Sequence, residues 1–190
     1  MGTKAFIAMI DLSKLSEPEL KQLCRETLAP HFRMVGDADS DYPEVVHFHT
    51  GRIFKPDFIC FPNKQHRLSG WPDWMFYIEV KDALGGNQGS RITEVAWQAK
   101  NYNDCICKFR LPAFTLVFPN FAVFIKQEEP AFKAYAEWFS GYMQRERVGE
   151  LFLHPGGGFK IKFSSSVLYD SKDGRSNFHL LDRQHRYCSQ

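Results

Sequence analysis

Two short apolar runs, separated by a polar loop, constrain the fold of this chain more than any other stretch. The runs cover residues 58–61 and 75–78 and consist almost entirely of aromatic and aliphatic side chains. The loop between them contains Gly70 and Pro72. Short apolar runs bounded by turn residues are typical of neighbouring antiparallel strands. The sequence therefore predicts a β-hairpin over residues 54–81.

Charged residues stand at the ends of both predicted strands. Asp57 opens the first strand and Glu79 closes the second, so the hairpin would bring the two carboxylates together. Lys81 lies two residues beyond Glu79, and side chains two positions apart in a strand share one face. We therefore expect two carboxylates and an ammonium at one edge of the sheet. A cross-strand salt-bridge cluster that only stabilises the hairpin would give the same pattern.

These residues form a recognisable pair of motifs. Pro56-Asp57 followed by Glu79-Val80-Lys81 resembles the core motif of the PD-(D/E)xK nuclease superfamily, which has the restriction-endonuclease-like fold. Residues 98–102 begin with Gln98 and end with Tyr102, and they resemble the QxxxY motif of nuclease domains related to RecB. The resemblance covers residues 16–126. It implies an α/β fold with a central mixed β-sheet flanked by helices.

The resemblance also implies a metal site. Asp57, Glu79 and the backbone carbonyl of Val80 would bind Mg²⁺, for which Mn²⁺ can substitute, because magnesium takes oxygen ligands. Lys81 would orient the attacking water and stabilise the charge that develops on the phosphate. Gln98 and Tyr102 would position this lysine or contact the DNA backbone. A second Pro-Asp pair ends at Asp73, six residues before Glu79, which leaves little room for a strand and a turn.

The first predicted helix could add a ligand. Ser16 fits the N-cap and Glu19 completes a capping box, while Pro30 ends the helix. In the resembled family, a helix in this place often supplies a glutamate to the metal. Glu19 and Glu26 are the candidates, and we prefer Glu26 because Glu19 already has a capping role. For either residue alone, a cap or a solvated charge is the simpler interpretation.

The rest of the chain predicts one domain over residues 1–170 and a polar C-terminal tail over residues 171–190. Lys160 and Lys162 would share one face of a strand, where they either touch a phosphate backbone or protect an exposed edge. The remaining predicted elements are strands at 31–35, 45–54, 113–118 and 121–126, helices at 91–103 and 130–147, and a terminal hairpin at 151–153 and 159–163.

The composition restricts the binding partners and the cellular compartment that the sequence predicts. The net charge of +2 does not by itself indicate nucleic-acid binding, so a DNA surface needs local clusters of lysine and arginine. Five cysteines without metal-type spacing fit a reduced intracellular protein. No apolar run approaches the ~18 residues of a membrane span. We therefore expect a cytoplasmic protein without membrane contact.

The function predicted from the sequence is that of a magnesium-dependent DNA nuclease acting in phage, recombination or repair processes. RNA stays open as a substrate. A homodimer would place two sites on two strands, but the sequence identifies no interface. The alternative is a protein of the same fold that binds nucleic acid or a partner protein without cleaving. Metal-dependent cleavage distinguishes the two.

Overall fold

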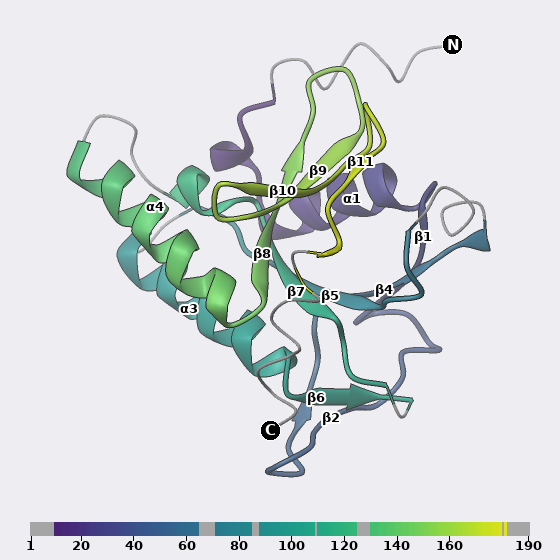
Figure 1. Cartoon of the computed structure of the whole chain (residues 1–190). Coiled ribbons are helices and arrows are strands. Elements are labelled where there is room, and N and C mark those ends of the chain that lie inside the picture. The colour runs from purple at the N-terminus through teal and green to yellow at the C-terminus, as the bar shows by residue number, and fades with distance from the viewer. Residues whose placement is uncertain are drawn as a thin grey trace.

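The computed structural model describes residues 10–64, 71–84, 88–108, 110–124, 130–179 and 181. Within this part of the chain, the α-helices are α1 (Glu17–Leu28), α3 (Gln88–Tyr102) and α4 (Pro130–Arg145), and the 3-10 helices are η2 (Leu12–Lys14) and η3 (Phe121–Phe124). The α-helices surround a mixed β-sheet, and a smaller sheet containing β2 and β6 projects from it (Figure 1). The mixed α/β class predicted from the sequence is confirmed.

The larger sheet combines antiparallel and parallel pairs. Its first three strands form an antiparallel unit, the next two pairs are parallel, and the remaining pairs are antiparallel. In spatial order its strands are β1 (Phe32–Gly36), β4 (Phe58–Pro62), β5 (Phe76–Val80), β7 (Phe114–Phe118), β8 (Val148–Leu153), β9 (Phe159–Phe163), β10 (Ser166–Asp170) and β11 (Arg175–Ser176).

The predicted hairpin is present as β4 and β5, which pair antiparallel with Phe58 opposite Ile78. Every residue of β5 is buried, because both faces of the sheet are covered. One face packs against α1, where Ile78 lies in a cluster with Leu20 and Leu28. The opposite face of the neighbouring strand β7 packs against α3 and α4, with Val117 among their apolar residues. Coverage on both faces explains why these strands read as continuous apolar runs.

Helix α1 begins as the sequence predicts. The Ser16 backbone N–H and hydroxyl both donate to the Glu19 carboxylate, at 2.8 and 2.6 Å. Leu20, Cys24 and Leu28 recur every four residues and are fully buried. This apolar stripe fixes which side of the helix faces the sheet.

The prediction of a strand at 121–126 is wrong for the residues that the structure describes, where η3 forms instead. Phe121 and Phe124 are both buried in the cluster beneath α4. Residues three apart share one side of a 3-10 turn but point to opposite faces of a strand. Asn120 starts the turn, since its side chain accepts a hydrogen bond from the Ala122 N–H at 3.2 Å. Residues 125 and 126 lie outside the described part.

The prediction of one strand over 45–54 is also wrong. The stretch forms β2 (Val45–His47) and β3 (Ile53–Phe54), which pair antiparallel across a turn. Gly51 has a φ of +66° in this turn, a conformation that glycine adopts without steric cost. Together with β6 (Cys105–Cys107), the two strands form the smaller sheet.

The C-terminal stretch 171–190, which we expected to be a polar tail, contributes β11 to the larger sheet. Phe178 packs against Trp71 with ring centroids 4.8 Å apart, and Leu181 is buried. Residues 182–190 lie outside the described part. None of the helices in the described residues is long and apolar enough to span a bilayer.

Candidate active site

The pairing of β4 and β5 brings the two expected carboxylates to one place. Asp57 directly precedes β4, and its Oδ2 accepts a hydrogen bond from the Val80 N–H at 2.6 Å. Glu79 stands one residue before Val80 near the end of β5. Both carboxylates are only 6% exposed. Two acidic side chains are therefore held side by side in a mostly dry environment.

Helix α1 adds a lysine that the sequence reasoning missed. The Lys21 ammonium lies 2.5 Å from Asp57 Oδ1 and 3.1 Å from Glu17 Oε1. It is also 3.7 Å from Asp37 Oδ2, in the turn after β1. Lys21 follows the buried Leu20 in the helix, so packing of the apolar stripe directs it toward the sheet edge. In this structure it supplies the positive charge that balances Asp57.

Lys81 lies at the same sheet edge, as expected, between two helices. Its ammonium is 3.3 Å from Glu94 Oε1 on α3 and 3.9 Å from Glu17 Oε2 on α1. Its backbone N–H donates to the Phe118 carbonyl at the end of β7, at 3.0 Å. Glu17 therefore contacts both lysines of the site, and it joins α1 to β5.

The QxxxY pair lies on the face of α3 that meets the site. The Tyr102 hydroxyl donates to Glu79 Oε2 at 2.9 Å, which places this tyrosine beside the carboxylate pair. Gln98 lies between Tyr102 and Glu94 at four-residue spacing, so the three share one helical face. Gln98 Oε1 is buried without a hydrogen-bond partner in the described residues. The structure thus brings Tyr102 to Glu79, whereas no hydrogen bond joins Gln98 Oε1 to Lys81.

The preferred helix glutamate is not at the site. Glu26 is exposed and accepts a hydrogen bond from Gln22 Nε2 at 2.9 Å, while Glu19 caps the helix. Glu17 is the glutamate that faces the site. At ~100° per residue, the nine positions between Glu17 and Glu26 place them on opposite sides of the helix. The buried stripe of Cys24 and Leu28 was the sequence signal that could have identified the correct side.

The environment perturbs the ionisation of the site. Burial, and then the neighbouring charge of Asp57, raise the pKa of Glu79 to about 8, although Tyr102 and Lys81 oppose the shift. Burial also raises the pKa of Asp57, against the opposing effect of Lys21 and the Val80 N–H. Burial is the largest single effect on Lys21 and would lower its pKa, but the hydrogen bonds and negative charges of Asp57, Glu17 and Asp37 together outweigh burial and raise the pKa. A cation held between the carboxylates would relieve their mutual repulsion.

The oxygen donors at the site suit a hard divalent cation. The described residues contain no group of three or more His, Cys, Asp or Glu side chains arranged to hold a metal ion. Magnesium commonly binds proteins through one or two carboxylates and keeps several waters. Asp57 and Glu79 provide that number, and Val80 offers a backbone carbonyl between Glu79 and Lys81. These residues fit Mg²⁺ or Mn²⁺.

Comparison of the chain with protein-family models, curated proteins and solved structures finds no match. Two buried carboxylates with a raised pKa, two ammonium groups and a buried tyrosine meet where β5 ends and α1 passes. Perturbed carboxylates of this kind occur at functional sites more often than elsewhere. The arrangement can hold a divalent cation and present an ammonium to an anionic substrate.

Proposed function

We propose that this protein is a magnesium-dependent nuclease that hydrolyses phosphodiester bonds in DNA. The observation that carries the proposal is the contact between Asp57 and the Glu79-Val80 backbone, with Lys81 at the same sheet edge. Residues that resemble a nuclease motif in the sequence thus come together from two strands and form one cluster. The hairpin alone accounts for the meeting of Asp57 and Glu79, whereas the contact of Tyr102 with Glu79 adds a residue of the second motif from a separate helix.

The architecture supports the same proposal. Helix α1 precedes three antiparallel strands, and α3 then leads to β7, which is parallel to β5. A central mixed sheet flanked by helices is the arrangement that the PD-(D/E)xK resemblance implies. We therefore extend the proposal to a restriction-endonuclease-like core formed by these elements.

Each residue of the site has a role in hydrolysis under this proposal. Asp57, Glu79 and the Val80 carbonyl would hold Mg²⁺, which supplies Lewis-acid activation and charge neutralisation when bound. Lys81 would orient the attacking water and stabilise the negative charge of the transition state. Tyr102 holds the Glu79 carboxylate in place through its hydroxyl. Glu17 positions both lysines, since it contacts Lys21 and Lys81.

One observation favours the alternative, a protein of this fold that binds without cleaving. Asp57 is already paired with Lys21, and Lys81 with Glu94. Ion pairs of this kind can stabilise a fold without taking part in any reaction. The distinction is chemical, because a stabilising cluster does not need a divalent cation.

A cleavage assay tests the proposal. Linear, circular, single-stranded and branched DNA, together with RNA, are incubated with the protein in Mg²⁺, Mn²⁺ or EDTA. The variants are Asp57→Asn and Lys81→Met, and Asp73→Asn is the matched control because it alters the second Pro-Asp pair, which is 54% exposed at its carboxylate. We expect metal-dependent cutting that Asp73→Asn retains and that the two site variants lose. Absence of cutting on every substrate, or cutting that survives both site variants, contradicts the proposal.

A further inference from the structure

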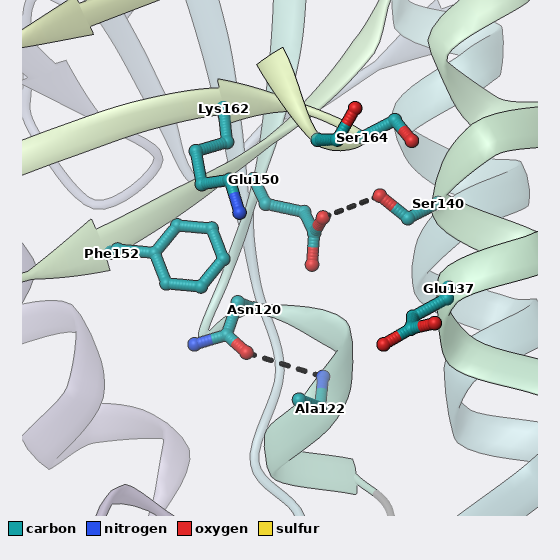
Figure 2. A pocket seen from close by; sticks show the side chains of 9 residues that line it. Asn120, Ala122, Glu137, Ser140, Glu150, Phe152, Lys162 and Ser164 are labelled. Carbon is teal, nitrogen blue, oxygen red and sulfur yellow. Dashed lines mark hydrogen bonds between the residues drawn. The ribbon is translucent and has the colours of Figure 1, made fainter. Parts of the chain in front are cut away.

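A cavity lies between η3, α4, β8 and β9 (Figure 2). Its volume is about 480 Å³, which falls within the ~300–1,000 Å³ of typical ligand pockets. The side chains that matter for its chemistry are Asn120, Ser140, Glu150, Phe152, Lys162 and Ser164. The proposed hydrolysis uses none of them.

Strand register connects this cavity to the site. Glu79 pairs with Val117, Val117 with Glu150, and Glu150 with Lys162, so these residues form one row across the sheet. Residues paired in register point to the same face. At ~4.8 Å per strand, the Cα atoms of Glu79 and Lys162 are roughly 14 Å apart. The middle of this row is covered, because Val117 packs against α3 and α4. A strand of nucleic acid bound at the site would therefore reach the cavity around the ends of β5 and β7.

The chain also links the two places directly. The Lys81 N–H donates to the Phe118 carbonyl, and Asn120, two residues further along, lines the cavity. Both places thus lie where β5 and β7 end. A substrate strand crossing this sheet edge would meet Lys81 and then Asn120.

The wall of the cavity combines an aromatic ring with the ammonium group of Lys162, and Lys160 lies beside the same ring. Phe152 is half-buried and belongs to none of the three apolar clusters of the core. The ammonium groups of Lys162 and Lys160 lie 5.2 and 5.9 Å from the centroid of its ring. Neither lysine forms an ion pair with a described residue. The charge of Lys162 also acts on the Glu150 carboxylate, and that of Lys160 on Asp170. A ring outside the core next to two ammonium groups suits a base and its phosphate.

The carboxylates of the cavity do not block an anionic ligand. Glu150 is buried, and its two oxygens accept hydrogen bonds from the Ser140 hydroxyl at 2.6 Å and the Phe121 N–H at 2.9 Å. It therefore fixes the start of η3 to α4. Glu137 is exposed on α4, on the far side of the cavity from Phe152 in Figure 2. Asn120 offers neutral hydrogen-bonding groups to a base edge, although its Oδ1 is partly engaged by the Ala122 N–H.

We infer that this cavity binds one unpaired nucleotide of the nucleic-acid substrate, with its base on Phe152 and its phosphate at Lys160 and Lys162. The inference rests on the proposed nuclease function and names the class of substrate. At ~3.4 Å per nucleotide of a stacked strand, the bound nucleotide lies roughly four steps from the cleaved bond. A base in a duplex is stacked and paired, so it has to leave the helix to enter such a pocket. The protein therefore prefers single-stranded or frayed nucleic acid over an intact duplex.

Binding of fluorescent oligonucleotides to the full chain tests this inference, with Ca²⁺ replacing Mg²⁺ to limit cleavage. We expect the wild-type protein to bind a single strand more tightly than the blunt duplex of the same sequence. Phe152→Ala should weaken single-strand binding roughly 5- to 150-fold, the loss typical of one stacked base. Lys162→Gln should make the slope of log Kobs against log salt concentration less negative by about 0.7, which is the contribution of one neutralised phosphate on a single strand.

Lys64→Gln is the matched control, because Lys64 is exposed and lies beyond the opposite end of β4 from Asp57. Its binding should equal that of the wild type, and circular dichroism checks that each variant is folded. If the protein cuts DNA in Mg²⁺ but both cavity variants bind like the control, or if duplex binds as well as single strand, the inference is wrong and the nuclease function stands. If the wild type neither binds nor cuts, both proposals fail.

Discussion

Replacing Glu79 by glutamine should stabilise the metal-free protein at high pH while it abolishes cleavage. Burial raises the pKa of Glu79 from 4.5 to about 8. Between these values the folded protein retains a proton that the unfolded chain has released. The contribution of this proton to stability is therefore fully present below about pH 4.5, falls as the pH rises, and is lost above about pH 8. Glutamine removes this cost because it carries no charge at any pH.

The size of the effect follows from the pKa of the carboxylate. An interval of about 3.5 pH units, at ~1.4 kcal/mol per unit, gives at most about 5 kcal/mol. Asp57 and Glu79 influence each other's protonation, so part of the shift belongs to Asp57, and the expected gain in the free energy of unfolding is about 2–5 kcal/mol. Glutamine is nearly the same size and can still accept the hydrogen bond from Tyr102, so the comparison isolates the charge. The gain should appear at about pH 9 and largely vanish at about pH 4.

Urea unfolding in EDTA over this pH range measures the free energy of unfolding of the wild type, Glu79→Gln and the control Glu26→Gln. Glu26 is exposed, so its substitution should leave the pH profile unchanged. Addition of Mg²⁺ at high pH should stabilise the wild type and have a much smaller effect on Glu79→Gln, because a bound cation favours the ionised pair. The reasoning is refuted if Glu79→Gln shows no gain at high pH relative to low pH.

Three further substitutions test the contacts of the site. Lys21→Met should destabilise the metal-free protein by about 1–3 kcal/mol in urea unfolding, because Asp57 loses its charged hydrogen-bond partner, and Mg²⁺ should restore part of the loss. Tyr102→Phe removes the hydroxyl that binds Glu79 and should lower the rate of DNA cleavage roughly 10- to 100-fold, whereas unchanged cleavage kinetics would exclude a positioning role. Glu17→Gln should lower the cleavage rate by a similar factor of roughly 10 to 100, and Glu26→Gln should leave the rate unchanged. A loss of cleavage in Glu26→Gln but not in Glu17→Gln would support Glu26 as the helix glutamate of the site.

The hairpin could be predicted because its signals are local. Two apolar runs and a turn define β4 and β5, and antiparallel pairing then places Asp57 opposite the end of β5 without any knowledge of the rest of the fold. The four-residue spacing from Glu94 to Tyr102 likewise fixes one face of α3. Contact between Tyr102 and Glu79 is the direct result.

The contribution of α1 could not be predicted from the residues near the motif. Which carboxylate reaches the site depends on how the helix rotates against the sheet, and that rotation is set by the burial of Leu20, Cys24 and Leu28. Considering the glutamates one by one led to Glu26, which lies on the solvent side. The apolar stripe indicates the side of α1 that carries Glu17 and Lys21, whereas their contacts with Lys81 and Asp57 required the packed structure.

The structure of the run that follows Pro119 could not be predicted from the sequence for a different reason. Apolar residues at 121–124 fit a strand or a single helical turn equally well, because a short run has no clear period. Packing decided between them, since Phe121 and Phe124 fill the same cluster beneath α4. The turn also places the Phe121 N–H at Glu150, which helps to form the cavity beside β8.

Binding of Mn²⁺ to the full chain tests the central claim most directly, since electron paramagnetic resonance distinguishes free from bound metal. The titration is made at about pH 8, where Glu79 is ionised in a substantial fraction of molecules. We predict that the wild type and Asp73→Asn bind the metal equally and that Mg²⁺ displaces it. Asp57→Asn should bind at least about tenfold more weakly. Equal binding by Asp57→Asn and the wild type would contradict the assignment of the metal site to Asp57 and Glu79.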